Sequence, residues 1–185
     1  HFFKVVFFIP SVTSSAAISM IFWMLYSKPG IINRLFGLLG FQAVDWLNNT
    51  ATALPSVMAL NIWTTAGFFM ITFLAGLQNI PDELYECAAI EGAPPATVFF
   101  RITLPMLRPQ ILYVVIMGTI GCLQVFDQVY FLIPNMRNAT YAFYIYKNAF
   151  QYGNMGYASA LAAVFMVIIL VITSIQRKVI RESAY

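Results

Sequence analysis

Long uncharged hydrophobic windows alternate along this chain with short stretches rich in polar residues, glycine and proline. A helix needs roughly 20 consecutive apolar residues to cross the hydrocarbon core of a bilayer, and windows of about that length occur four times. We therefore predict an all-α fold, a polytopic bundle of about four membrane helices in a single domain over residues 1–185. The predicted spans cover about residues 5–26, 54–77, 109–132 and 157–175.

The first predicted span contains a proline and a polar cluster, namely Pro10 followed by Ser11, Thr13, Ser14 and Ser15. In lipid, backbone groups freed by such an interruption are tolerated only where neighbouring helices or a water-filled path satisfy them. The cluster fits a polar path through the membrane and, equally well, a proline kink whose serines bond to their own helix.

Polar side chains also follow one face of the second predicted span. Asn61, Thr64, Thr65 and Phe68 lie at positions i, i+3, i+4 and i+7, which share one side of a helix. Such groups either join neighbouring helices, with hydrogen bonds that contribute about 0.6 kcal/mol on average, or contact a solute. The pattern favours neither role over the other.

The third predicted span holds Asp127, the only acid inside any of the four windows. An ionisable residue within a membrane is costly and is by default a functional candidate that faces a cavity or a partner. Gln124 lies three residues earlier, so a continuous helix would place both side chains on one face, where they could bind hydroxyl groups. The alternative is that Asp127, near the end of the span, only meets water at the outer interface.

The connection over residues 27–52 is too rich in glycine, proline and asparagine to cross a membrane. Its apolar residues Ile31, Ile32, Leu35 and Phe36 recur at helical spacing, with Trp46 nearby, which is typical of an element that lies in the membrane interface. A structural role is the favoured interpretation.

Residues 82–105 form the one polar island between two long apolar segments, and they carry four of the seven acids. Asp82 and Glu83 suit the positive end of a helix, and Gly92 suits a left-handed helix end. A second helix can begin at Pro95 and is expected to end before Pro105. We predict two short helices joined by a hinge. The first helix would have an apolar stripe of Leu84, Cys87 and Ala88, with Glu86 off the stripe.

Composition narrows the class of protein further. Only 9% of the residues are charged, against about 25% in soluble proteins, and the net charge of +3 is too small and dispersed to indicate nucleic-acid binding. No phosphate-binding loop occurs, His1 is the only histidine, and neither Cys87 nor Cys122 has a base or second ligand nearby in the sequence. We therefore expect no disulfide and no enzymatic activity in this chain.

The island resembles a known signature. Glu86-Cys87-Ala88 is followed after three residues by Gly92 and, after nine more, by Ile102-Thr103-Leu104-Pro105. This spacing is that of the cytoplasmic loop in the integral membrane subunits of ATP-binding cassette importers that work with an extracytoplasmic binding protein. The single departure is Cys87, where the family usually has another small residue. The resemblance extends over nearly the whole chain and is strongest to the carbohydrate branch, which includes the maltose and glycerol phosphate importers.

The resemblance implies a set of partners and a location. It implies two cytoplasmic ATPase subunits, whose clefts receive the island as a coupling loop, and a second permease subunit that is related but different. It also implies an extracytoplasmic solute-binding protein and a multi-pass position in the cell inner membrane. No cofactor is expected on this chain, because ATP and magnesium would bind the ATPase subunits. The family has further membrane helices before this point, so at least one is expected to precede the sequence.

The resemblance also implies two groups of functional residues. The ATPase-coupling group comprises Glu86, Ala88, Gly92, Ile102, Leu104 and Pro105. The substrate-pathway group, which would contact a sugar or related polyol, comprises Ser11, Ser15, Thr64, Thr65, Phe68, Gln124 and Asp127. One departure from the carbohydrate branch is the stretch from Pro134 to Asn138, where the branch commonly has a Gly-Gly-Pro motif.

Two other functions remain compatible with the residues alone. An ion-coupled secondary transporter or channel could use Asp127, and a membrane scaffold would need no solute at all. An obligatory ATPase partner distinguishes the importer subunit from both.

Overall fold

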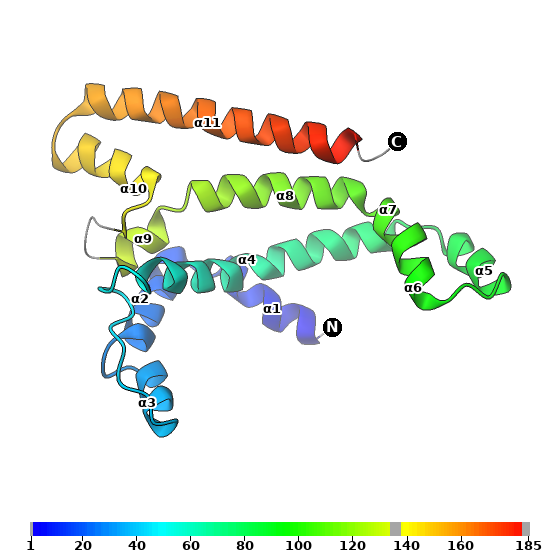
Figure 1. Cartoon of the computed structure of the whole chain (residues 1–185), viewed down its shortest axis with the longest axis horizontal. Helices are drawn as coiled ribbons and strands as arrows, with labels where there is room; N and C mark the ends of the chain where they lie inside the picture. The colour runs from blue at the N-terminus through cyan, green and yellow to red at the C-terminus, as the bar shows by residue number, and fades with distance from the viewer. Residues whose placement is uncertain (1, 134–137, 183–185) are drawn as a thin grey trace. The chain divides into compact units, whose positions relative to one another are not determined.

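The structure, a computed structural model, describes residues 2–133 and 138–182, and every regular element in these ranges is helical (Figure 1). The all-α prediction is confirmed. The α-helices are α1 (Phe2–Val12), α2 (Ser15–Tyr26), α3 (Ile31–Leu38), α4 (Ala53–Gln78), α5 (Asp82–Ile90), α6 (Pro95–Val98), α7 (Leu104–Met106), α8 (Arg108–Leu123), α9 (Asp127–Leu132), α10 (Tyr141–Tyr146) and α11 (Met155–Glu182). Two π-helical turns are η1 (Phe99–Thr103) and η3 (Lys147–Gln151).

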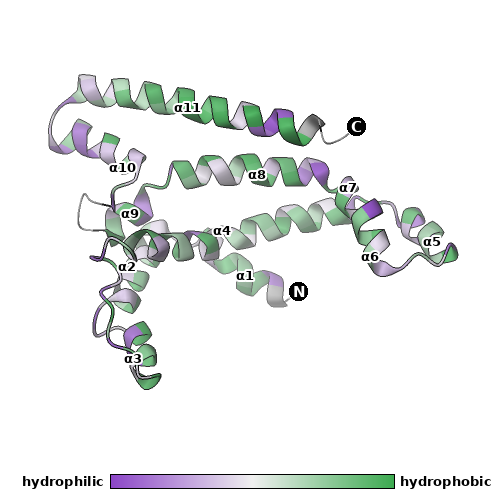
Figure 2. Ribbon diagram, in the orientation of Figure 1, coloured by the Kyte–Doolittle hydropathy of each residue, from purple (hydrophilic) through white to green (hydrophobic). Residues whose placement is uncertain are grey.

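Three stretches in the described part are long and apolar enough to cross a membrane: Ala53–Gln78, Arg108–Leu132 and Met155–Ile180. A fourth candidate is the bent pair made of Lys4–Val12 and Ser15–Leu38. Figure 2 shows that hydrophobic residues dominate α4, α8 and α11. The chain is therefore a multi-pass membrane protein with up to four spans in the residues described.

The first predicted span, over residues 5–26, is not one straight helix. It consists of α1 and α2, which are separated by a break at Thr13 and Ser14. The segments Lys4–Val12 and Ser15–Leu38, which meet at this break, bend by 103°. Pro10 lies inside α1, where its missing N–H and its ring weaken the helix just before the break. Thr13 Oγ1 donates back to the Ile9 carbonyl at 2.8 Å, whereas Ser11 Oγ donates to the Thr64 carbonyl of α4 at 2.6 Å. The polar cluster therefore bonds both to its own helix and to a neighbour.

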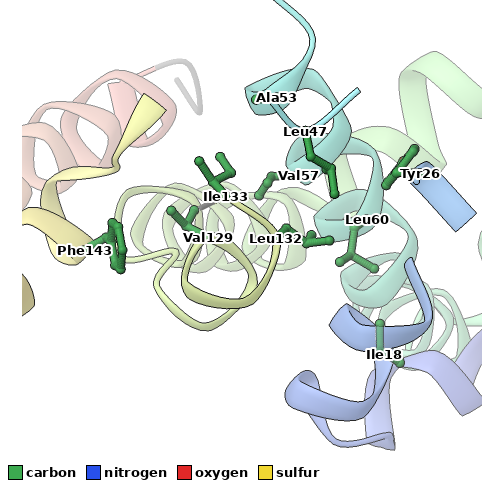
Figure 3. Close-up of a cluster of buried hydrophobic side chains, with 10 residues drawn as sticks. All are labelled: Ile18, Tyr26, Leu47, Ala53, Val57, Leu60, Val129, Leu132, Ile133 and Phe143. Carbon is green, nitrogen blue, oxygen red and sulfur yellow. The ribbon is translucent and has the colours of Figure 1, made fainter. Parts of the chain in front are cut away.

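The helices form two compact units, each with its own internal packing: His1–Gly67 with Gly121–Ile168, and Phe68–Ile120 with Ile169–Tyr185. In the first unit α2 packs against α9, and a buried hydrophobic cluster joins residues of α2, α4, α9 and α10 (Figure 3). Leu60, Val129 and Leu132 are fully buried there. This cluster holds the broken helices in place.

In the second unit, the later part of α4 lies against α8. A Cβ on Gly76 would come within 2.6 Å of the Gln110 side chain, so the absent side chain permits this close approach. Gln176 Nε2 of α11 donates to Thr119 Oγ1 of α8 at 2.7 Å. Glycine and amide contacts thus replace the hydrophobic driving force that is absent between helices in lipid.

The connection over residues 27–52 contains α3 and a loop fastened to it. The buried side chain of Asn33 donates to the carbonyls of Ser27, Lys28 and Val44, and its Oδ1 accepts from the Val44 amide and from Trp46 Nε1. Ile31 and Leu35 on the same helix are exposed. This amphipathic arrangement is that expected of an interfacial element.

Gly67 is the point where α1 crosses α4 in the first unit. A Cβ at this position would collide with the backbone carbonyl of Phe7. Gly67→Val is expected to destabilise the protein by about 1–3 kcal/mol, because the collision is with backbone that cannot rotate away. The measurement is the thermal midpoint of the purified membrane complex. Ala66→Val, which adds bulk at the exposed adjacent position, is the matched control and should leave the midpoint nearly unchanged.

Candidate functional site

The island of residues 82–105 forms one candidate site, and it lies entirely in the second unit. Helix α5 begins after Pro81, with Asp82 and Glu83 in its first turn. It ends at Gly92, whose φ of +66° is the left-handed conformation that glycine adopts freely. The Gly92 amide donates to the Ala89 carbonyl and the Ala93 amide to the Ala88 carbonyl, the two bonds of a Schellman helix end. The predicted positive φ at Gly92 is confirmed.

The apolar stripe predicted for α5 is only partly buried. The hydroxyls of Tyr85 and Thr103 lie 3.1 Å apart and share a hydrogen bond, so this side of α5 faces η1. Of the three stripe residues, Ala88 is buried, whereas Leu84 and Cys87 are exposed. The stripe therefore stays a prediction, because the exposed part of it is free to meet a partner.

The second helical piece also runs further than predicted. Helix α6 begins at Pro95, but it continues through η1 into α7 and passes Pro105, which lies in the first turn of α7. Within the wide turn of η1 the Leu104 amide donates to the Phe99 carbonyl, five residues back. The α-helical bonding is already interrupted there, so the missing N–H of Pro105 does not end the helix.

The predicted coupling residues divide into two groups by exposure. Ala88 is buried, and Ile102, Leu104 and Pro105 are half-buried, so these four hold the two short helices together. Glu86 and Gly92 are exposed, and no side-chain partner of Glu86 occurs in the described part of the chain.

Apolar side chains accompany Glu86 on the outside of this loop. Ile90, one turn along the same outward face of α5, is 87% exposed, and Phe99 and Phe100 on η1 are also exposed. A carboxylate beside such a surface is suited to docking on another protein through a few apolar contacts and one charged contact.

Gly92→Val is expected to strain the backbone by about 1–2 kcal/mol, because a β-branched residue disfavours positive φ. In the importer that the resemblance implies, uptake should fall while the solute still binds the solute-binding protein normally, and both can be measured on the same preparation. Gly153→Val is the matched control, since Gly153 also has a positive φ of 69° and open space around it but lies outside the loop. Equal losses of uptake in both variants would mean that general strain, rather than this loop, is responsible.

A polar pocket of about 220 Å³ in the first unit forms the second candidate site. Its wall comes from the α1–α2 break, from α4 and from the segment between α8 and α9, through the residues Ser15, Asn61, Gln124, Val125, Phe126, Asp127 and Gln128. Irregular backbone at membrane depth is stable only where it is buried or lines a cavity. Two broken helices therefore meet at one polar cavity.

The break between α8 and α9 was not predicted. Helix α8 ends at Leu123 and α9 begins at Asp127, so Gln124 and Asp127 share the pocket without sharing a helix face. Thr140 Oγ1 donates to the Val125 carbonyl at 2.8 Å, which satisfies one of the backbone groups that the break leaves free. Asp127 is in the first turn of α9, where its negative charge is also favourable to the helix.

The structure divides the predicted substrate-pathway residues. Ser15, Gln124 and Asp127 line the pocket. Ser11 is engaged with α4, and Thr64 and Thr65 donate their hydroxyl protons to carbonyls one turn earlier in α4. Phe68 belongs to the second unit, where it is exposed and lies beside Phe69.

Two polar residues of the pocket lay outside the predicted pathway group. Asn61 lies on the polar face predicted for the second span, and Gln128 belongs to neither predicted group. Gln128 Nε2 donates to Thr64 Oγ1 at 3.3 Å, which ties α9 to α4. The spacing of four residues between Gln124 and Gln128 was the signal in the sequence that could have indicated the second glutamine.

Comparison with known proteins finds a family of membrane transport components and relatives that are permease subunits. The model of the family described as "Binding-protein-dependent transport system inner membrane component" matches residues 1–183. The sulfoquinovosyl glycerol transport system permease protein SmoG of Agrobacterium fabrum is 36% identical over 162 residues, covering 86% of this chain and 53% of that protein. The arabinooligosaccharides transport system permease protein AraP of Bacillus subtilis is 35% identical over 184 residues, covering 96% of this chain and 59% of that protein.

The fold is also that of a solved transporter. A crystal structure of a bacterial alginate ABC transporter, in complex with an alginate pentasaccharide-bound periplasmic protein, matches with a TM-score of 0.88 at 25% identity. The match covers 98% of this chain and 65% of that one. The present chain thus spans between about half and two thirds of the length of these proteins.

Proposed function

We infer the function of this chain from the family to which it belongs, the binding-protein-dependent transport system inner membrane components. We propose that the chain is a membrane-spanning subunit of an ATP-driven importer. In this proposal it passes a sugar or a related polyol from an extracytoplasmic binding protein across the inner membrane. The relatives' names support this class of solute, since they mention sulfoquinovosyl glycerol and arabinooligosaccharides.

The observation that carries the proposal is the two-helix loop with its exposed acid. Glu86 and Ile90 face outward from α5, while Ala88 and Thr103 are buried and keep the loop compact. A rigid loop with an outward charge and apolar side chains is suited to fit a cleft on a partner and to transmit its movement. We propose that this partner is a cytoplasmic ATPase subunit and that Glu86 meets a basic residue there.

The remaining partners follow from the same proposal. A second permease subunit would complete the path across the membrane, and a second ATPase subunit would serve that permease. ATP and magnesium would bind the ATPase subunits, and this chain would bind no cofactor. The pocket at the two helix breaks would form this chain's share of the solute path, since transporters bind solutes where discontinuous helices meet within the membrane.

Co-purification tests the proposal. The chain carries an affinity tag, is expressed with the genes that surround it, and is purified from membranes in mild detergent. The expected result is a complex that contains an ATPase with a phosphate-binding loop in a fixed ratio to the chain. A stable, functional preparation without any ATPase would contradict the proposal.

A further inference from the structure

The polar pocket of the first unit contains one charged group, the Asp127 carboxylate, among neutral polar side chains. Ser15, Asn61 and Gln124 can both donate and accept hydrogen bonds. The Asp127 carboxylate accepts only, and it has no hydrogen-bond or ion-pair partner in the part of the chain that the structure describes. The Oε1 atom of Gln128 is buried and also has no partner in that part. The orientation of the Gln128 amide has a physical reason. The Thr64 hydroxyl donates its proton within α4, so towards Gln128 it can act only as an acceptor and must face the NH₂ group.

The charge of the pocket wall is negative. The wall contains Asp127 but no lysine, arginine or histidine among the described residues. The ion pair between Lys28 and Asp45 lies outside the pocket wall. A bound anion would therefore meet the Asp127 carboxylate, with no cation in the pocket wall to offset the repulsion. Asp127 is exposed, so the repulsion between it and a bound anion is that of a pair near a protein surface, with an effective dielectric constant of about 20.

The pocket also has one aromatic wall. The Phe126 ring lies 4.9 Å from the ring of Tyr146 and 5.7 Å from that of Tyr130, so neighbouring aromatic rings hold it in place. A fixed ring of this kind can cover the apolar face of a sugar ring while the acceptors bind its hydroxyls. The volume of 220 Å³ is below the roughly 300–1,000 Å³ of a whole ligand site, so this chain would hold only part of a solute.

We propose that this pocket selects uncharged, hydroxyl-rich saccharides over saccharides that carry a carboxylate, and that Asp127 is the residue that sets this selection. The proposal rests on the proposed function as a sugar importer and adds a charge rule to it. A saccharide hydroxyl donates to Asp127, whereas the neutral side chains of Ser15, Asn61 and Gln124 can bond to either class of solute. A uronate oxygen can only accept, and its charge repels Asp127.

The selection is tested on the complete importer in proteoliposomes, with ATP inside and the binding protein outside. The solutes are neutral oligosaccharides and uronate-bearing oligosaccharides with the same number of rings. Mass spectrometry measures each solute accumulated inside and each solute bound to the binding protein. Dividing the amount accumulated by the amount bound corrects the measured preference for the selectivity of the binding protein.

The wild-type importer should favour neutral solutes by this ratio, and Asp127→Asn should reduce the preference by about thirtyfold. That is the effect expected for two like charges about 8 Å apart at an effective dielectric constant of about 20. Asp45→Asn, which removes one negative charge outside the pocket, should keep the wild-type preference. Equal ratios for the two solute classes in the wild type, or an unchanged preference in Asp127→Asn, would overturn the proposal.

A second measurement does not need transport and separates this proposal from the proposed function. In a background where Cys87 and Cys122 are replaced by serine, Ser15→Cys places a single thiol of this chain in the pocket wall. Anionic and cationic thiol reagents of equal size are then reacted with it in the assembled complex. The cationic reagent should react faster, and Asp127→Asn should remove most of that difference. Importers that move no solute would contradict the proposed function, whereas equal reagent rates with Asp127 present would contradict the charge rule.

Discussion

Glu86→Gln is expected to lower solute uptake by about one to two powers of ten while the complex still assembles. Glu86 is exposed on α5 and takes no part in the packing of Ala88 and Thr103, so the loop should keep its fold. Glutamine preserves size and shape but lacks the charge that the proposed pairing with a basic residue in an ATPase cleft requires. A shielded charge-assisted hydrogen bond contributes about 1.5–3 kcal/mol, which accounts for an effect of this size.

The measurement combines uptake with solute-stimulated ATP hydrolysis in membranes that contain equal amounts of assembled complex. Glu83→Gln is the control, because Glu83 is also exposed on α5 but lies in its first turn. Its contribution to the helix dipole is about 0.3–1 kcal/mol, so transport should stay almost normal. Normal uptake in Glu86→Gln together with lost uptake in Glu83→Gln would assign the coupling role to the other acid.

Asp127→Ala should reduce uptake by at least about tenfold and should abolish the stimulation of ATP hydrolysis by solute. The carboxylate can accept two solute hydroxyls in the pocket, and a site built around such bonds is weakened strongly when they are lost. Assembly and basal ATP hydrolysis should remain, because the buried cluster of Figure 3 lies among Leu60, Val129 and Leu132 and does not include Asp127.

Uptake kinetics of the variant at several solute concentrations provide the measurement, with Asp45→Ala as the control. Asp45 forms an exposed ion pair with Lys28 at 3.5 Å, a contact of about 0–1 kcal/mol, and its loss should leave uptake unchanged. If Asp127→Ala also transports normally, the carboxylate only stabilises the start of α9, which is the interfacial role considered from the sequence.

The sequence predicted the features that depend on neighbouring residues. Positive φ at Gly92 and helix starts after Pro81 and at Pro95 follow from the properties of glycine and proline alone. The rotation of α5 could not be predicted in this way. It depends on the contact between Tyr85 and Thr103, and no local pattern indicates that two hydroxyls in different short helices will meet.

The geometry of the helix breaks could not be predicted for a different reason. Lipid surrounds a membrane helix, so hydrophobicity is the same whether the helix is straight or bent. Pro10 and the Ser/Thr cluster indicated an interruption in the window over residues 5–26, but not the 103° bend between Lys4–Val12 and Ser15–Leu38. The break after Leu123 contains no proline, and the Thr140 hydroxyl that supports it lies 15 residues from Val125. Ser15, Gln124 and Asp127 could nevertheless be predicted, because polar side chains inside a membrane are costly and therefore mark candidate functional positions whether the helix is straight or broken.

The importer function itself is tested most directly by the energy source for uptake. Proteoliposomes contain the complete complex, with the binding protein and a saccharide solute outside and ATP with magnesium inside. We expect uptake to require internal ATP, to stop when the phosphate-loop lysine of the ATPase is replaced, and to continue when ionophores collapse all ion gradients. Uptake that proceeds without ATP and stops with the ionophores would contradict the account, since it would make this chain part of an ion-coupled transporter.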